Sequence, residues 1–170
     1  DDNRVGDRYG AHVHARDGVL TVGDSTFTGG RARRGGALYL SGGQATLEDS
    51  LFEANSVRGD HDDPEAPSSG RGGAIRTEDT DLWITSVVFR GNEAVQGYGG
   101  HLSLVQGEVV ITDGTFEDGE ATWYYGGAIA TYDTVLDVYE STFTDNRALE
   151  ELDDWIGYGG AVWIGGGVRR

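Results

Sequence analysis

The chain has 170 residues, contains no cysteine, and carries a formal net charge of −16 from 29 acidic and 13 basic residues. This charge disfavours nucleic acids and anionic membranes as partners, and the absence of cysteine excludes disulfide bonds. We recognise neither a signal peptide nor an apolar run of the roughly 18 residues that a membrane-spanning helix requires, so we expect one domain that does not insert into a membrane.

A glycine pair followed by a phenylalanine recurs along the chain at a constant spacing. In the clearest copies the second glycine precedes the phenylalanine by sixteen residues: Gly36 and Phe52, Gly73 and Phe89, Gly100 and Phe116, Gly127 and Phe143. An earlier copy has Ala11 and Phe27, and Gly160 begins a sixth. A spacing that is constant while the rest varies indicates a structural repeat.

Apolar residues alternate with other residues inside each copy, which is the period of a β-strand and not of a helix. One set of alternating pairs follows the glycines directly: Leu38/Leu40, Leu102/Leu104 and Val162/Ile164. A second set comes nine and eleven residues after the second glycine: Leu20/Val22, Ala45/Leu47, Leu82/Ile84, Val109/Ile111 and Leu136/Val138. Short strands with glycine at the corners predict an all-β fold, a right-handed parallel β-helix over residues 1–170 with about five turns plus a partial sixth.

Two constant positions predict ladders inside the helix. The phenylalanines are expected to stack on one another from turn to turn. Three residues later, Asn55, Asn92 and Asn146 predict an internal amide ladder. Gly30 and Gly119 replace the asparagine in two copies, which we interpret as a left-handed backbone position that both residue types tolerate.

The alternation of these two motifs resembles the signature repeats of the polymorphic outer-membrane proteins of chlamydiae, over nearly the whole chain. The glycine motif stands as Gly35-Gly36-Ala37-Leu38, Gly72-Gly73-Ala74-Ile75, Gly126-Gly127-Ala128-Ile129 and Gly159-Gly160-Ala161-Val162, and departs as Gly99-Gly100-His101-Leu102. The resemblance implies an adhesin or passenger module of autotransporter type, secreted or exposed on a bacterial outer surface.

Taken in order, the chain opens with Asp1-Asp2-Asn3-Arg4-Val5, which matches residues 144–148. It therefore begins in mid-turn, and it also stops early in its sixth copy, so we expect a segment of a longer solenoid. The first turn carries His12 and His14, two residues apart. We expect them on one exposed face and not in a metal site, because no third ligand is near in sequence.

The second turn contains the longest insertion, between Val57 and Arg71, with both prolines of the chain. Its acidic residues could hold Ca²⁺, the one cofactor that the sequence suggests: Asp60, Asp62, Asp63 and Glu65. They lack EF-hand spacing, so a solvated acidic loop is favoured. Arg58-Gly59-Asp60 is an integrin-type tripeptide, but such a triplet arises readily by chance in this composition.

A column of aromatic and arginine residues precedes the glycine pairs, one per turn: Tyr9, Arg34, Arg71, Tyr98, Tyr125 and Tyr158. Such stacking suits a structural ladder with cation–π contacts or a binding stripe for sugar rings. A second insertion lies between Arg147 and Tyr158, at the same corner as the first. The candidate ligand-binding residues are Tyr98, Tyr125, Tyr158, Trp123, Trp155 and Trp163.

A mostly acidic column stands three residues before each phenylalanine: Asp24, Asp49, Ser86, Asp113 and Glu140. Stacked carboxylates can cleave polysaccharides, but these lie in turn-like contexts and lack an accompanying Arg or His, so we assign no catalytic residue. The sequence favours a non-catalytic surface or secreted module, an adhesin or stalk whose partner is a glycan or protein of a host or neighbouring cell. A carbohydrate-active lyase or hydrolase is the alternative.

Overall fold

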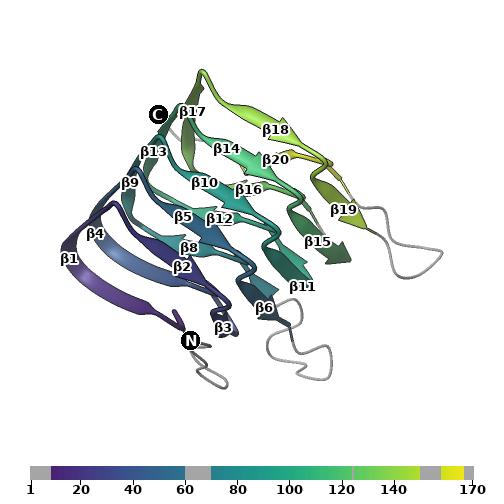
Figure 1. The fold of residues 1–170 in the computed structure, drawn as a ribbon, viewed down its shortest axis with the longest axis horizontal. Coiled ribbons are helices and arrows are strands. Elements are labelled where there is room, and N and C mark those ends of the chain that lie inside the picture. The colour runs from purple at the N-terminus through teal and green to yellow at the C-terminus, as the bar shows by residue number, and fades with distance from the viewer. Residues whose placement is uncertain (1–8, 60–69, 124, 150–157, 167–170) are drawn as a thin grey trace.

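The computed structural model describes residues 9–59, 70–123, 125–149 and 158–166, and within them the chain forms twenty β-strands and no helix. All strand pairs are parallel, and each strand pairs with the equivalent strand of the next turn. The result is a β-solenoid whose turns stack from β1 at one end to β17 and β18 at the other (Figure 1). The predicted all-β parallel solenoid of about five turns is confirmed.

Three sheets form the walls of the solenoid. The largest has nine strands, of which β1 (Val13–Gly23) and β4 (Leu38–Glu48) run along its full width. Later turns divide this width into two shorter strands each. One half contains β8 (Ile75–Glu78), β12 (Leu102–Val105), β16 (Ile129–Tyr132) and β20 (Val162–Gly165). The other half contains β9 (Asp81–Thr85), β13 (Glu108–Thr112) and β17 (Val135–Tyr139).

The other two sheets are built from shorter strands. The five-stranded sheet carries the phenylalanines and contains β2 (Thr26–Thr28), β5 (Leu51–Glu53), β10 (Val88–Arg90), β14 (Thr115–Glu117) and β18 (Thr142–Thr144). The six-stranded sheet contains β3 (Arg31–Ala32), β6 (Ser56–Arg58), β7 (Gly70–Arg71), β11 (Glu93–Tyr98), β15 (Glu120–Trp123) and β19 (Arg147–Leu149). The segments before both insertions, β6 and β19, therefore belong to one sheet.

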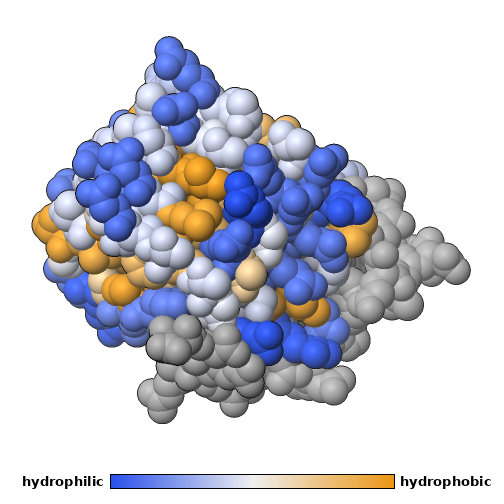
Figure 2. Space-filling model, viewed as in Figure 1, coloured by the Kyte–Doolittle hydropathy of each residue, from blue (hydrophilic) through white to orange (hydrophobic). Residues whose placement is uncertain are grey.

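The predicted phenylalanine stack lies in the core. Consecutive rings are nearly parallel, with centroids 4.7 to 5.1 Å apart and interplanar angles of 5° to 16°. Phe52, Phe89 and Phe116 are completely buried. The alternating aliphatic residues point inward with them, including Leu38, Leu82 and Ile111. Hydrophilic residues surround small groups of hydrophobic ones on the face seen in Figure 2, which shows the solvated exterior of this core.

The turns change direction at residues with positive φ. One such site per turn is the acidic column, Asp24, Asp49, Ser86, Asp113 and Glu140, with φ between 44° and 54°. Another lies two residues after each phenylalanine, at Gly29, Ala54, Gly91, Asp118 and Asp145. The prediction that the asparagine positions are left-handed is therefore wrong, because in every turn the left-handed residue is the one before.

The predicted amide ladder is present, and it gives a different reason for the glycines that replace asparagine, Gly30 and Gly119. Asn55 Nδ2 donates to Asn92 Oδ1 over 3.0 Å, and Asn92 Nδ2 donates to His101 Nδ1 over 2.9 Å. His101 Nε2 lies 3.1 Å from Asn146 Oδ1. Since an amide nitrogen can only donate, Nδ1 is the acceptor, and the neutral imidazole donates its Nε2 proton to Asn146. His101 thus continues the ladder through the turn in which Gly119 replaces asparagine.

His12 occupies the same position in the first turn, and the prediction of an exposed histidine pair is wrong for it. Its ring packs edge-on against Phe27, with centroids 5.6 Å apart. His14 points to the outer face, where it contacts Tyr9 and Tyr39. The chain turns at Gly10, whose φ is 58°, shortly before β1 begins at Val13, so spacing by two does not place these side chains on one face.

Candidate ligand-binding groove

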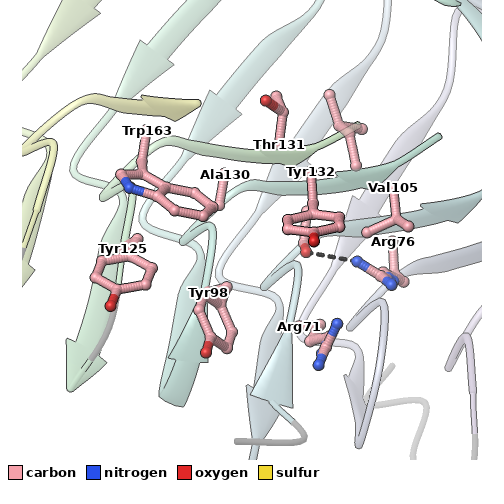
Figure 3. A pocket seen from close by; sticks show the side chains of 11 residues that line it. Arg71, Arg76, Tyr98, Val105, Tyr125, Ala130, Thr131, Tyr132 and Trp163 are labelled. Atoms are coloured by element: carbon pink, nitrogen blue, oxygen red, sulfur yellow. Dashed lines mark hydrogen bonds between the residues drawn. The ribbon is translucent and has the colours of Figure 1, made fainter. Parts of the chain in front are cut away.

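A groove of about 360 Å³ opens on the outer face of the sheet half that contains β8, β12, β16 and β20 (Figure 3). Inward and outward side chains alternate along these strands. Because the strands pair in the register of the repeat, the outward side chains form columns that run from turn to turn. The groove is the space between three such columns.

The floor exists because one column changes from large to small side chains. Turn by turn, this column contains His14, Tyr39, Arg76, Ser103, Ala130 and Trp163. Ser103 and Ala130 leave a hollow that Arg76 closes at one end and Trp163 at the other. Three strand spacings separate these two larger residues, so the hollow is about 14 Å long.

Aromatic rings border the hollow. One wall contains Tyr98 and Tyr125, whose ring centroids are 5.5 Å apart. Tyr125 stacks on Trp163 with centroids 4.5 Å apart and an interplanar angle of 19°. Tyr132 stands on the opposite wall beside Val105 and is 51% exposed. The Trp163 end of the groove is therefore aromatic on both sides.

Arginines occupy the other end. The Arg71 guanidinium carbon lies 5.4 Å from the centroid of the Tyr98 ring. Arg76 is 3% exposed and donates from Nη1 to Ser103 Oγ over 2.9 Å, the bond drawn in Figure 3. Arg76 also donates from Nε and Nη2 to Glu78 Oε1, over 3.2 and 3.0 Å.

Glu78 is held as a carboxylate beside the groove. It accepts hydrogen bonds from Tyr39 Oη at 2.9 Å and Arg34 Nη1 at 3.4 Å in addition to those from Arg76. Burial alone would raise the pKa of Glu78, but these partners outweigh it and lower that pKa. Burial and then the neighbouring Arg71 lower the pKa of Arg76 to about 10, so it stays a cation at neutral pH.

The structure brings three of the predicted ligand-binding residues together, Tyr98, Tyr125 and Trp163. Tyr158 does not line the groove but continues the wall column, with its ring centroid 5.4 Å from that of Tyr125. The side chain of Trp123 and all of Trp155 lie outside the described residues. The proposed Ca²⁺ cluster, Asp60, Asp62, Asp63 and Glu65, lies outside them as well.

Sequence reasoning missed the floor and the second wall. Arg76, Ser103, Ala130 and Tyr132 line the groove but were not selected as candidates. The available signal was the outward position two residues after the alanine or histidine of each glycine motif, where the residue size varies from turn to turn. Aligning those positions by turn shows the change from large to small that creates the hollow.

The acidic column does not line the groove, and its residues stand at corners where the chain turns. Its five members occupy left-handed corners, and Ser86 Oγ donates to Asp113 Oδ2 over 3.1 Å. Asp and Ser tolerate such corners because their short polar side chains bond to nearby backbone. Conformation therefore accounts for the residue types of this column.

Nothing in the described ranges suggests a metal centre, since they contain no group of three or more His, Cys, Asp or Glu residues able to hold a metal ion. In the same ranges no helix is long and apolar enough to cross a membrane. Comparison of the chain with family models, curated proteins and solved structures found no match.

Proposed function

We propose that this protein is a non-catalytic module of a surface or secreted β-solenoid protein and that it binds carbohydrate in the groove between Arg76 and Trp163. The observation that carries this proposal is the aromatic border of the groove, formed by Tyr98, Tyr125, Tyr132 and Trp163. Sugar rings present apolar C–H faces that pack against flat aromatic rings, and their hydroxyl groups require polar neighbours such as Ser103 and the arginines.

The rigidity of the platform supports binding over a purely structural role. Tyr132 and Trp163 project from β16 and β20, which pair with each other, and Tyr125 forms an isolated β-bridge with Tyr158. A site built on strands is preorganised, so a ligand that enters it loses little affinity to the ordering of the protein. The volume of about 360 Å³ is within the usual range for ligand sites.

A polysaccharide-cleaving role has less support. Among the residues that the structure describes, no aspartate or glutamate lines the groove, and the nearby Glu78 is an ion-paired carboxylate. A glycosidase needs two carboxyl groups on either side of the scissile bond. We therefore propose an adhesin or stalk with a glycan partner on a host or neighbouring cell, as the resemblance to chlamydial repeats also implies, at a bacterial outer surface.

A glycan array with matched variants tests this proposal. Trp163→Ala removes the side chain that closes one end of the groove, and Tyr132→Ala removes one wall, while Trp83→Ala removes an exposed tryptophan of β9, outside the groove. We expect the unchanged protein and Trp83→Ala to bind the same glycans and the two groove variants to lose them. Absence of binding to every glycan, or binding that both groove variants retain, would contradict the proposal.

A further inference from the structure

We propose that the groove selects an acidic glycan, with a sugar carboxylate or sulfate at its Arg71–Arg76 end and a sugar ring against Tyr125 and Trp163 at the other. This inference rests on the proposed carbohydrate binding and adds the charge of the ligand. It follows from the local charge, from unused arginine donors and from the position of the groove on a sheet face.

The groove is locally cationic in an acidic molecule. The carboxylate of Glu78 forms ion pairs with the guanidinium groups of Arg34 and Arg76 at 3.4 and 3.0 Å. A third guanidinium group, that of Arg71, lines the groove together with Arg76. Arg71 forms no ion pair with any residue in the part of the chain that the structure describes. Although 29 of the 170 residues are acidic, none of those that the structure describes lines the groove, so one further anion complements this end.

The arginines also have hydrogen-bond donors available. Arg71 Nε is buried without a hydrogen-bond partner among the described residues. Arg76 uses three of the five N–H donors of its guanidinium group on Glu78 and Ser103. A buried donor without a partner is costly, and planar guanidinium groups match the two oxygens of a carboxylate or sulfate. An anionic oxygen at this end would therefore satisfy groups that the protein leaves unsatisfied.

The sheet face favours a sugar over an acidic peptide. Peptides often bind by adding a strand to a sheet edge, where backbone groups are open. The strands under the groove, β12 and β16, are paired on both sides, so their backbone groups are already used. Recognition must come from side chains, and the side chains present are flat rings at one end and guanidinium groups at the other.

The net charge of −16 should make the binding of anions selective, because an acidic protein repels polyanions in general. Binding of an acidic glycan must then depend on the few arginines of one site. Removal of one of them should have a large effect, whereas removal of an arginine elsewhere should have a small one.

Calorimetric titration with matched oligosaccharides tests the inference. The probes are oligogalacturonate, its methyl ester, which keeps the rings but loses the charge, and a sulfated oligosaccharide of similar length. The variants are Arg71→Gln, Arg71→Lys, and Arg90→Gln as control, since Arg90 lies on β10 and pairs with Glu53 and Glu117 on another sheet. Circular dichroism establishes that each variant is folded.

We expect at least one anionic probe to bind more tightly than the neutral ester, by about tenfold or more, as for a hydrogen-bonded charge. Arg71→Gln should abolish that preference, Arg71→Lys should keep part of it, and Arg90→Gln should keep all of it. The anionic probe that binds identifies the carboxylate or the sulfate as the natural group.

The outcomes separate this inference from the proposed function. Equal affinity for acid and ester, lost in Trp163→Ala but unchanged in Arg71→Gln, would overturn the charge selection and leave carbohydrate binding intact. Binding to no sugar, or binding only to an acidic peptide such as polyglutamate, would overturn both.

Discussion

The imidazole of His101 occupies space that asparagine side chains fill in other turns. A β-carbon added to Gly119 would lie 2.5 Å from His101 Nε2, and one added to Gly30 would lie 2.6 Å from the His12 ring. Histidine and glycine therefore occur together within a turn, whereas the remaining complete turns combine alanine with asparagine, as in Ala128 and Asn146. Each pairing fills the same volume.

This complementarity predicts a strong coupling between two substitutions. His101→Ala removes two ladder hydrogen bonds and leaves a cavity, so we expect a loss of about 2–4 kcal/mol in unfolding free energy. Gly119→Asn alone should destabilise by overpacking against the imidazole. The double variant restores the alanine–asparagine pair and should recover most of the loss once the Gly127 carbonyl, 2.5 Å from the added β-carbon, has shifted. Denaturant unfolding of all four proteins checks this, and strictly additive losses would contradict the shared volume.

The same histidine predicts a pH dependence. Burial lowers the pKa of His101 to about 3, below the ordinary value of 6.5. Below pH 6.5 the unfolded state therefore binds more protons than the folded state, and the contribution of His101 to stability is lost as the pH falls from about 6.5 to about 3. The limiting slope for one proton is about 1.4 kcal/mol per pH unit.

The double variant is the control for this effect, because it retains every carboxylate. Its stability should fall less steeply between pH 6.5 and 5 than that of the unchanged protein. Parallel pH profiles of the two proteins would show that His101 accepts its proton readily in the folded state.

Strands and stacking order could be predicted from the sequence, because both follow from side-chain periodicity. Inward positions such as Leu82 and Phe89 repeat in every turn and are completely buried. The corners could not be read in the same way, since Asp118, Ala54 and Gly91 occupy equivalent left-handed positions. One wall of the groove could be predicted, because Tyr125 belongs to a column of tyrosines and arginines that recurs in every turn. The floor could not, because Ser103 contributes to it only by being smaller than its neighbours in the column.

The first insertion can be removed on the basis of strand register. Arg58 pairs with Val95 and Gly70 with Gly97, so only Gln96 separates these positions on β11. Deleting residues 60–69, which lie outside the described ranges, joins Gly59 to Gly70. The joined segment of turn two then has the same number of residues as the part of β11 with which it pairs. Gly59 then takes the place of Gln96, whose φ of 55° glycine adopts readily.

We expect this deletion to leave the fold intact, because shortening a loop changes closure entropy by only about 0.6 kcal/mol per halving. Circular dichroism and thermal unfolding provide the measurement. A shortened protein that is unfolded, or whose melting temperature falls sharply, would show that the insertion covers part of the core.

In the whole molecule, part of the net negative charge lies at the corners between strands, where many of the residues are acidic. Within the described ranges, nine acidic residues occupy left-handed corners, so part of the charge of −16 comes from residues that form turns. At the end of the stack, Ile164 follows the inward column of Leu104 and Thr131 but is 66% exposed, and Val138 is 37% exposed. An apolar strand edge and a repulsive charge thus act in opposite directions on association.

We expect the 170-residue polypeptide to be most nearly monomeric at low salt and to associate end to end as salt rises. Open strand edges pair with other strands, and salt screens the repulsion, with a Debye length of about 8 Å at physiological ionic strength. Light scattering across a salt series measures this. A monomer at every salt concentration would show that the edge is closed to other copies.

A crystal structure with the most tightly bound oligosaccharide would show directly whether the outer groove binds a glycan. We expect a sugar ring packed against Trp163 and Tyr125, with an anionic group hydrogen-bonded to Arg71. A glycan bound on another face, such as the outer side of β9, β13 and β17, with the groove empty, would contradict this expectation.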